Sequence, residues 1–217
     1  MKNLVLNGCI KLISNTNKEY DQEKLSIIRY GLESIYILLT KLVFIFVVSI
    51  FLHIFKEVVI FLLIYNIIRT PSFGLHATKS WMCWIASTII FIGVPLICKH
   101  VEISCIQRAV ICSICILRVC KNAPADTYKR PIISKTRRER FKLISTLMAI
   151  IMSFSSIFIN DMFLANAFMF ALVVQCFMIS PYVYKAFKLP YDNYKNYQSN
   201  GIWFYKVRYI KRKEGEE

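Results

Sequence analysis

Residues 69–83 read Arg-Thr-Pro-Ser-Phe-Gly-Leu-His-Ala-Thr-Lys-Ser-Trp-Met-Cys and interrupt a chain that is otherwise strongly apolar. Pro71 and Gly74 are residue types that mark turns, so we expect the backbone to break here between two apolar helices. His76 and Cys83 are the two side-chain types that form a thiolate nucleophile and its general base. This interval therefore divides the chain and contains the first candidate residues for chemistry.

The composition combines a high apolar content with unbalanced positive charge. Hydrophobic residues make up 56% of the 217 residues, and 28 lysines and arginines stand against 13 acidic residues. A polytopic membrane protein has this combination, because its basic residues gather on the cytoplasmic flanks of its spans. The basic clusters lie between long apolar runs, which disfavours a nucleic-acid-binding protein. We therefore predict a single integral-membrane domain over residues 1–217 and the lipid bilayer as its partner.

Six apolar stretches predict an all-α membrane helical bundle, since the hydrocarbon core of a bilayer is about 30 Å thick. They lie at residues 35–52, 58–68, 81–98, 103–120, 143–159 and 162–184. The second stretch gives only about 16 Å of helix and must borrow polar flanks, tilt or be sheltered by neighbours. The bundle is thus expected to have six membrane-embedded segments, either six spans or four full spans with two re-entrant segments. Residues 1–20 are expected to form an N-terminal interfacial amphipathic helix, because apolar residues recur there at helical spacing.

The basic residues predict which side of the membrane each loop occupies. The loop at 121–142 carries eight lysines and arginines, and the tail at 185–217 carries eight more. The short polar gaps on the other side carry only Lys56 and Lys99. Because basic loops remain in the cytoplasm, we expect a multi-pass cell-membrane protein with both termini cytoplasmic. The same arithmetic places residues 69–83 on the cytoplasmic side.

The eight cysteines do not predict a disulfide framework. Most of them fall in predicted membrane helices, where a free cysteine packs as a small hydrophobe. Cys112 and Cys115 form a Cys-x-x-Cys pattern, but this pair lies inside an apolar stretch without a nearby histidine. A metal or redox role is therefore disfavoured. We expect neither a metal site nor a cofactor.

The spacing of His76 and Cys83 sets a geometric condition on any catalytic role. On one continuous helix, residues seven apart are about 10 Å apart along the axis, whereas a nucleophile and its base need about 3 Å. Either the two residues are a solvated histidine and a packed cysteine, or His76 lies outside the helix that carries Cys83. Gly74 before His76 and a helix cap near Ser80 favour the second arrangement. Asp126, in the basic loop on the same predicted face, is a candidate to orient the imidazole.

Three features together resemble one known family. They are Arg69, the sequence Gly74-Leu-His76-Ala77 followed by Cys83, and the sequence Ala123-Pro-Ala-Asp-Thr-Tyr-Lys-Arg-Pro131. In this order, and on one predicted face, they are similar to the accessory gene regulator B (AgrB) family. Members of that family are integral-membrane cysteine endopeptidases of peptide quorum sensing. The family usually has a Gly-Gly pair where this chain has Phe73 and Gly74.

The resemblance implies that Cys83 is the nucleophile, that His76 is the base, and that Arg69 and Gly74 support the site. It implies removal of the acidic C-terminal tail of an AgrD-like propeptide through an acyl-enzyme thioester, followed by closure of a thiolactone or lactone ring. It also suggests a homodimer. An acidic tail would be attracted to the basic loop. We therefore predict these substrate-binding residues: Lys129, Arg130, Arg137, Arg138 and Arg140.

Two other functions remain open from the sequence. One is a non-catalytic membrane peptide exporter or scaffold, which would not need the Cys83 thiol. The other is an acyltransferase that acts on lipid or protein through the same nucleophile but needs no peptide substrate. A neighbouring short open reading frame that encodes an amphipathic helix, a central Cys or Ser and an acidic tail would favour peptide processing over both.

Overall fold

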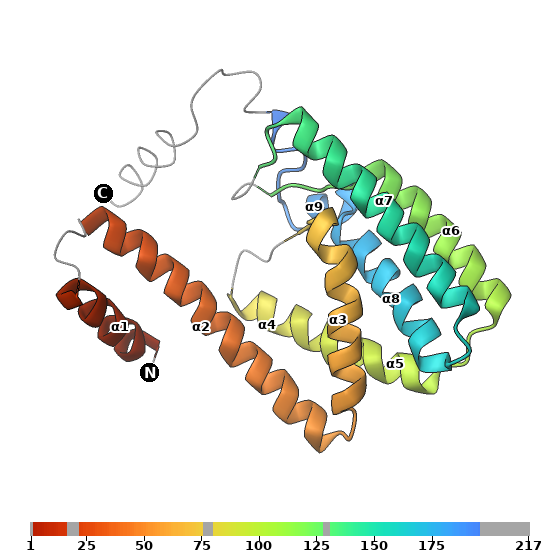
Figure 1. The fold of residues 1–217 in the computed structure, drawn as a ribbon, viewed down its shortest axis with the longest axis horizontal. Coiled ribbons are helices and arrows are strands. Elements are labelled where there is room, and N and C mark those ends of the chain that lie inside the picture. The colour runs from red at the N-terminus through yellow and green to blue at the C-terminus, as the bar shows by residue number, and fades with distance from the viewer. Residues whose placement is uncertain (1, 17–21, 76–79, 128–130, 196–217) are drawn as a thin grey trace. The chain divides into compact units, whose positions relative to one another are not determined.

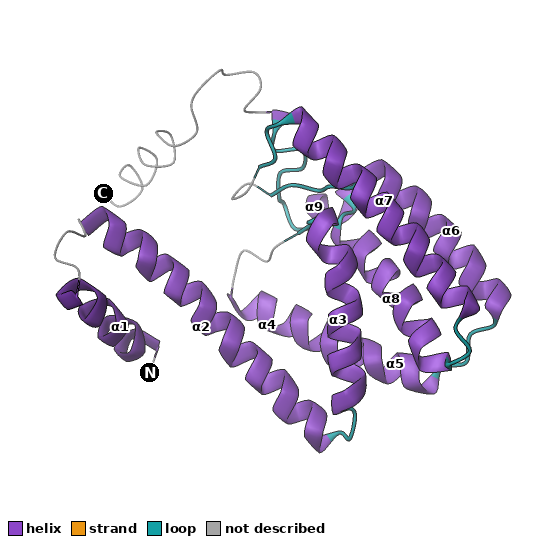
Figure 2. Cartoon of the chain, in the orientation of Figure 1, coloured by secondary structure: helices purple, strands orange, loops and turns teal. Residues whose placement is uncertain are grey.

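The structure, a computed structural model, describes residues 2–16, 22–75, 80–127 and 131–195. Within these ranges the chain is helical with short connections, and no strand occurs (Figures 1 and 2). The prediction of an all-α fold is therefore confirmed. The chain forms two compact units, one before and one after residue 55. Each unit is described by itself, and the expectation of one domain stays a prediction.

The first unit consists of helix α1 (Lys2–Thr16) and helix α2 (Gln22–Phe51), which contact each other. Helix α1 occupies the expected N-terminal segment, and its place at a membrane interface stays a prediction. Helix α2 ends where His53 takes a left-handed conformation with φ 53°. The N–H of Ile54 then donates to the carbonyl of Ser49 at 2.9 Å, which closes the helix end. This turn accounts for the polar gap in the sequence between the first two apolar stretches.

The second unit contains the remaining helices. These are α3 (Phe55–Ser72), α4 (Ser80–Thr88), the π-helical turn η1 (Ile89–Gly93), α5 (Val94–His100), α6 (Cys105–Asn122), α7 (Lys135–Phe158), α8 (Met162–Met178) and α9 (Pro181–Ala186). Helices α6, α7 and α8 run side by side and contact one another, and α5 contacts α8 (Figure 1). Their shared core is apolar and includes Val119, Met152 and Leu172, all buried.

Capping side chains explain where the three bundle helices begin. Ser104 and Gln107 form a reciprocal capping box at the start of α6. The Ser134 side chain accepts from a backbone N–H in the first turn of α7. The Asp161 carboxylate accepts from the N–H of Leu164 at 2.8 Å at the start of α8. Each cap satisfies an N–H group that the helix itself leaves unpaired.

Helix lengths and surfaces agree with a membrane bundle. Among the described residues, three helical stretches are long and apolar enough to cross a membrane: Lys24–Phe51, Trp81–His100 and Lys135–Phe158. Helix α8 is a shorter apolar helix. Large apolar side chains such as Leu117 and Phe158 are exposed on the outer surface, where lipid rather than water would cover them. Each of the six predicted segments is largely helical in the structure, although residues 81–98 comprise α4, η1 and part of α5, and residues 162–184 comprise α8 and part of α9.

Helix α3 extends the brief apolar stretch at 58–68 through its polar flanks, which is one of the three arrangements expected from the sequence. Its 18 residues give about 27 Å of helix. The stretch from Ser80 to His100 contains an irregularity before Pro95, the π-helical turn η1. Proline lacks an N–H and its ring crowds the carbonyl of residue i−4, so the preceding turn must widen.

Two predicted boundaries are wrong. The basic stretch 121–142 is not a loop throughout, because α7 begins at Lys135 and not at residue 143. Ser134 caps that helix, and the basic residues after it are good helix formers. The last apolar segment, predicted to run to residue 184, ends at Met178. Ser180 is extended and forms the N-cap of the short helix α9, which begins at Pro181, so the backbone changes direction here.

Candidate active site at the α3–α4 connection

The three residues after α3 leave the helix and are held by two distant segments. The N–H of Gly74 donates to the carbonyl of Ala125 at 2.9 Å, and the N–H of Ala125 donates back to the last residue of α3 at 3.1 Å. Residues 73 and 125 thereby form an isolated parallel bridge. The N–H of Leu75 donates to the carbonyl of Met178, at the end of α8, at 2.9 Å. The backbone is thus anchored directly before His76 in the sequence.

Arg69 holds the same turn from the last part of α3. Its guanidinium donates to the carbonyl of Phe73 and, at 2.7 Å, to the carbonyl of Leu75. A longer contact of 3.4 Å reaches the carbonyl of Gly74. A guanidinium presents several donors in a rigid fork, so it can bind successive carbonyls in a way that a lysine ammonium cannot. Arg69 therefore stabilises the turn, which gives a physical basis to the supporting role that the resemblance implies.

Gly74 is the residue type that this turn requires. Its φ of +113° lies in a region that L side chains rarely adopt. A Cβ atom built at this position would lie 2.5 Å from Nη1 of Arg69 and 2.9 Å from the carbonyl oxygen of Met178. The second contact is with backbone, which cannot move cheaply. The sequence correctly marked Gly74 as a turn residue, and the structure adds this close approach.

Phe73 also takes a left-handed conformation, with φ 56°. This is an uncommon backbone region for a bulky residue, and it favours glycine. The finding gives a reason for the Gly-Gly pair that is usual in the AgrB family. In this chain the Phe73 ring instead packs edge-on against Phe141, with ring centroids 5.0 Å apart. Its carbonyl accepts from Nε2 of Gln175 at 2.9 Å as well as from Arg69.

Cys83 lies in the first turn of α4, which begins at Ser80 as expected, and its side chain is half-buried. Residues 73–75 are not helical, so residues 73–83 do not form one unbroken helix. His76 lies outside the described residues, and its pairing with Cys83 stays a prediction.

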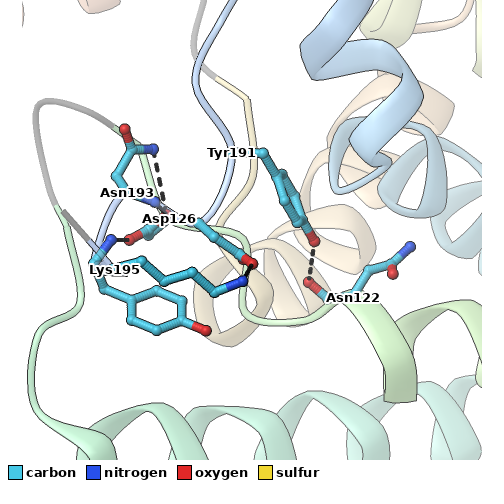
Figure 3. Close-up of polar contacts among 7 residues, drawn as sticks. Asn122, Asp126, Tyr191, Asn193 and Lys195 are labelled. Atoms are coloured by element: carbon cyan, nitrogen blue, oxygen red, sulfur yellow. Dashed lines mark hydrogen bonds and ion pairs between the residues drawn. The ribbon is translucent and has the colours of Figure 1, made fainter. Parts of the chain in front are cut away.

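Asp126 is buried in the connection after α6, and its carboxylate binds the chain beyond α9 (Figure 3). Oδ1 accepts from the backbone N–H of Asn193 at 2.9 Å, and Oδ2 accepts from the backbone N–H of Tyr194 at 2.8 Å. The structure therefore shows Asp126 holding the C-terminal segment. An additional role in orienting His76 stays a prediction.

Known proteins that are similar to this chain identify its family. The family model for accessory gene regulator B matches residues 7–179. The chain belongs to the AgrB family. A putative AgrB-like protein of Clostridium acetobutylicum is 26% identical over 202 residues, covering 91% of this chain and 96% of the relative. A putative AgrB-like protein of Listeria innocua is 28% identical, covering 86% and 92%.

The accessory gene regulator protein B of Staphylococcus carnosus is 30% identical over 136 residues, which cover 63% of this chain and 71% of that protein. No solved structure matches the chain. Membership gives this AgrB-family protein a role in accessory gene regulator quorum sensing. The family match includes α3, the α3–α4 connection and Cys83, and it ends before α9 and the segment that binds Asp126.

The basic residues expected to bind substrate differ in whether their side chains are engaged by other parts of the protein or exposed. Arg138 donates to the carbonyls of Ile132 and Ile133 at 2.9 and 2.8 Å, and its guanidinium lies 3.8 Å from the ring centroid of Tyr194. Nη1 of Arg138 is thus engaged by two backbone carbonyls, and the plane of its guanidinium is covered by Tyr194. Arg137 and Arg140 are exposed on the first turns of α7. They present their charge to the surroundings.

Two predicted substrate-binding residues, Lys129 and Arg130, lie outside the described residues. Three residues of the site were missed by sequence analysis: Gln175, Asn193 and Tyr194. Gln175 and Asn193 are fully buried polar residues. The sequence offered one signal for them, which is that Gln175 lies inside an apolar stretch. A buried amide needs a hydrogen-bond partner, so this glutamine could have been expected to bind another segment. Asn193 and Tyr194 act mainly through backbone N–H groups, which any residue except proline carries.

Proposed function

We propose that this protein is a membrane-embedded cysteine endopeptidase that removes the acidic C-terminal tail of an AgrD-like propeptide. The observation that supports the proposal is the placement of Cys83 in the first turn of α4, on the connection whose other end is anchored by Arg69 and Gly74. A nucleophile must be held in a defined position relative to its base. The anchored turn at residues 73–75 directly precedes His76 in the sequence and would help to hold this base in position.

The proposed reaction has two acyl transfers. His76 takes the proton of Cys83, and the thiolate attacks the carbonyl of the peptide bond before the acidic tail. The C–N bond breaks, the tail leaves with a protonated amino terminus, and a Cys83 thioester remains. A cysteine thiol or serine hydroxyl of the propeptide then attacks this thioester and closes a thiolactone or lactone ring. The Cys83 thiol is restored with the proton that the attacking group loses.

The surroundings of the site fit an amphipathic substrate with an acidic tail. Arg137 and Arg140 are exposed and would attract the tail, together with Lys129 and Arg130. An amphipathic propeptide would already lie at the membrane interface. Limited access of water to a membrane-embedded thioester would favour ring closure over hydrolysis. We place this site on the cytoplasmic side and expect the protein to act as a homodimer.

The test is processing of a co-expressed propeptide, followed by mass spectrometry of the released tail and of the enzyme. Wild-type protein should release the tail, and Cys83→Ser should lose nearly all turnover because a hydroxyl is a far weaker nucleophile. Cys120→Ser is the matched control, since Cys120 is another free thiol, exposed on α6. Normal tail release by Cys83→Ala would exclude the mechanism and favour the exporter or scaffold.

The same assay separates a catalytic pair from two independent residues. His76→Ala should lose about as much activity as Cys83→Ser, and the double variant should lose little more, because members of a catalytic pair are strongly non-additive. Multiplicative losses would contradict a His76–Cys83 unit. The sidedness is tested by introducing cysteine at Thr136, an exposed position on α7, and labelling intact cells. Labelling of that position by an impermeant reagent would refute the cytoplasmic site.

A further inference from the structure

We propose that residues 190–194, termed here the C-terminal clasp, are a positioning element of the candidate active site and act through Asp126. The proposal rests on the proposed function of Cys83. The clasp is more than a hundred residues from Cys83 in the sequence, and it lies beyond the family match, which ends at residue 179. Only the tertiary structure brings it to Asp126, next to the residue that pairs with the α3–α4 turn.

Both carboxylate oxygens of Asp126 accept hydrogen bonds from the clasp (Figure 3). Two successive backbone N–H groups, of Asn193 and Tyr194, donate at 2.9 and 2.8 Å, and the Asn193 side-chain amide adds a contact of 3.4 Å. Asn193 is fully buried and Asp126 nearly so, at 3% exposed. A carboxylate that accepts from several backbone N–H groups away from water is bound strongly, because these bonds are charge-assisted.

Tyrosine hydroxyls tie the clasp and the preceding helix α9 to the same connection. The hydroxyl of Tyr191 donates to the carbonyl of Asn122, at the end of α6, at 3.3 Å. The hydroxyl of Tyr184 donates to the backbone carbonyl of Asp126 at 3.1 Å. Burial, reinforced by the nearby carboxylates of Asp192 and Asp126, raises the pKa of Tyr191 to about 12. Its hydroxyl therefore remains a donor at any pH at which the enzyme would work.

The connection after α6 transmits this attachment to the candidate site. Asp126 directly follows Ala125, whose carbonyl accepts from Gly74 and whose N–H donates to the end of α3. The chain of contacts thus runs from the clasp through Asp126 and Ala125 to the turn before His76. Both oxygens of Asp126 accept hydrogen bonds from the clasp, and in this scheme the effect of Asp126 on the site passes through the backbone. Asp126 is a positioning residue in this scheme.

The experiment compares three full-length variants in lipid nanodiscs with a synthetic propeptide. Asp126→Asn keeps the shape but replaces one acceptor with a donor, so that one clasp N–H loses its partner. Asn193→Ala removes only the side-chain bonds to Asp126 and to the carbonyl of Pro190. Lys195→Gln is the control, because it removes the neighbouring ion pair of 2.6 Å with Asp192 and no bond to Asp126.

Three quantities are measured: kcat, KM, and the pH dependence of Cys83 alkylation followed by peptide mass spectrometry. For Asp126→Asn we expect kcat to fall between about tenfold and hundredfold, since small misplacements of catalytic groups have effects of that size. KM should stay nearly constant, because Arg137 and Arg140 are untouched. The alkylation profile should move to higher pH as the imidazole loses its alignment with the thiol. Asn193→Ala should show the same changes more weakly, and Lys195→Gln should show none.

The outcomes distinguish this inference from the proposed function. Suppose that Cys83→Ser is inactive but both Asp126→Asn and Asn193→Ala keep the wild-type kcat and alkylation profile. This result would refute the role of the clasp and leave the proposed protease function intact. A fall in kcat with an unshifted profile would also overturn it, because that result indicates general destabilisation. If Asp126→Asn does not fold, Asn193→Ala decides by the same criteria. Normal processing by Cys83→Ser would instead refute the proposed function.

Discussion

Gly74→Ala should open the turn before His76 while leaving the helical bundle folded. The substitution places a Cβ atom at a residue whose φ is +113°, a strained conformation for alanine that costs about 1–3 kcal/mol. The new atom would lie 2.9 Å from the Met178 carbonyl oxygen and 2.5 Å from Nη1 of Arg69. If the guanidinium moves away, its bonds to the carbonyls of the turn weaken, and each bond to a charged donor contributes about 1.5–3 kcal/mol.

The strain and the loss of one such bond together amount to about 2.5–6 kcal/mol, which reaches the lower part of the range for the total stability of a domain. The turn can relieve most of the strain by opening locally, because only residues 73–75 and their partners need to separate. In Gly74→Ala we therefore expect the amide hydrogens of the residues next to position 74, above all that of Leu75, to exchange with solvent much faster than in wild type. Propeptide processing should fall at least a hundredfold, since the catalytic geometry depends on this turn.

Hydrogen exchange with mass spectrometry on the peptide that contains residues 70–80 measures the local effect, and thermal unfolding in detergent measures the global one. Gly93→Ala is the matched control. Gly93 has a helical φ of −64°, and a Cβ atom there meets nothing within 4 Å. Alanine at such a position should be neutral or stabilise by up to about 1 kcal/mol. Wild-type exchange and processing in Gly74→Ala would show that the close approach to Met178 does not constrain this turn.

Three further predictions test separate parts of the structure. Phe73→Gly and Phe73→Ala lose the same ring contact, but only glycine relaxes the φ of 56°, so Phe73→Gly should be more stable by about 1 kcal/mol in thermal unfolding; equal stabilities would contradict strain at this residue. Arg137→Gln with Arg140→Gln should raise KM for the propeptide at low salt and little at high salt, because charges are screened beyond about 8 Å at physiological ionic strength; an unchanged KM at every salt concentration would remove both residues from substrate binding. The Lys99 ammonium, 2.7 Å from Glu57, lowers the pKa of that carboxyl from 4.5, so the ion pair stabilises the fold above about pH 4.5 and its contribution is lost as pH falls through the lowered pKa; melting temperatures of Glu57→Gln should therefore lie below wild type at neutral pH and converge with it in acid, and a constant difference across pH would refute the assignment.

The apolar and polar patterning of the sequence was sufficient to locate the helices. In the apolar interior of a membrane a helix satisfies its own backbone groups, and all six predicted segments are largely helical in the structure. The break at Gly74 and the start of α4 near Ser80 were also predictable, because turn residues and caps act locally. The expectation that Pro71 breaks the backbone was wrong, because Pro71 lies inside the last turn of α3, which ends at Ser72. The boundary of α7 was missed because the basic residues after Ser134 look like a solvated loop in composition, although they are good helix formers.

The surroundings of the turn depended on tertiary structure alone. Gln175 lies 102 residues from Phe73, and the clasp residue Asn193 lies 67 residues from Asp126. Their bonds involve backbone carbonyls and N–H groups, which every residue of the chain offers, so no residue type in the sequence identifies the partner. The sequence could mark Asp126 only as a candidate functional carboxylate. Which donors satisfy it was decided by the packing that brings the chain beyond α9 back to the connection after α6.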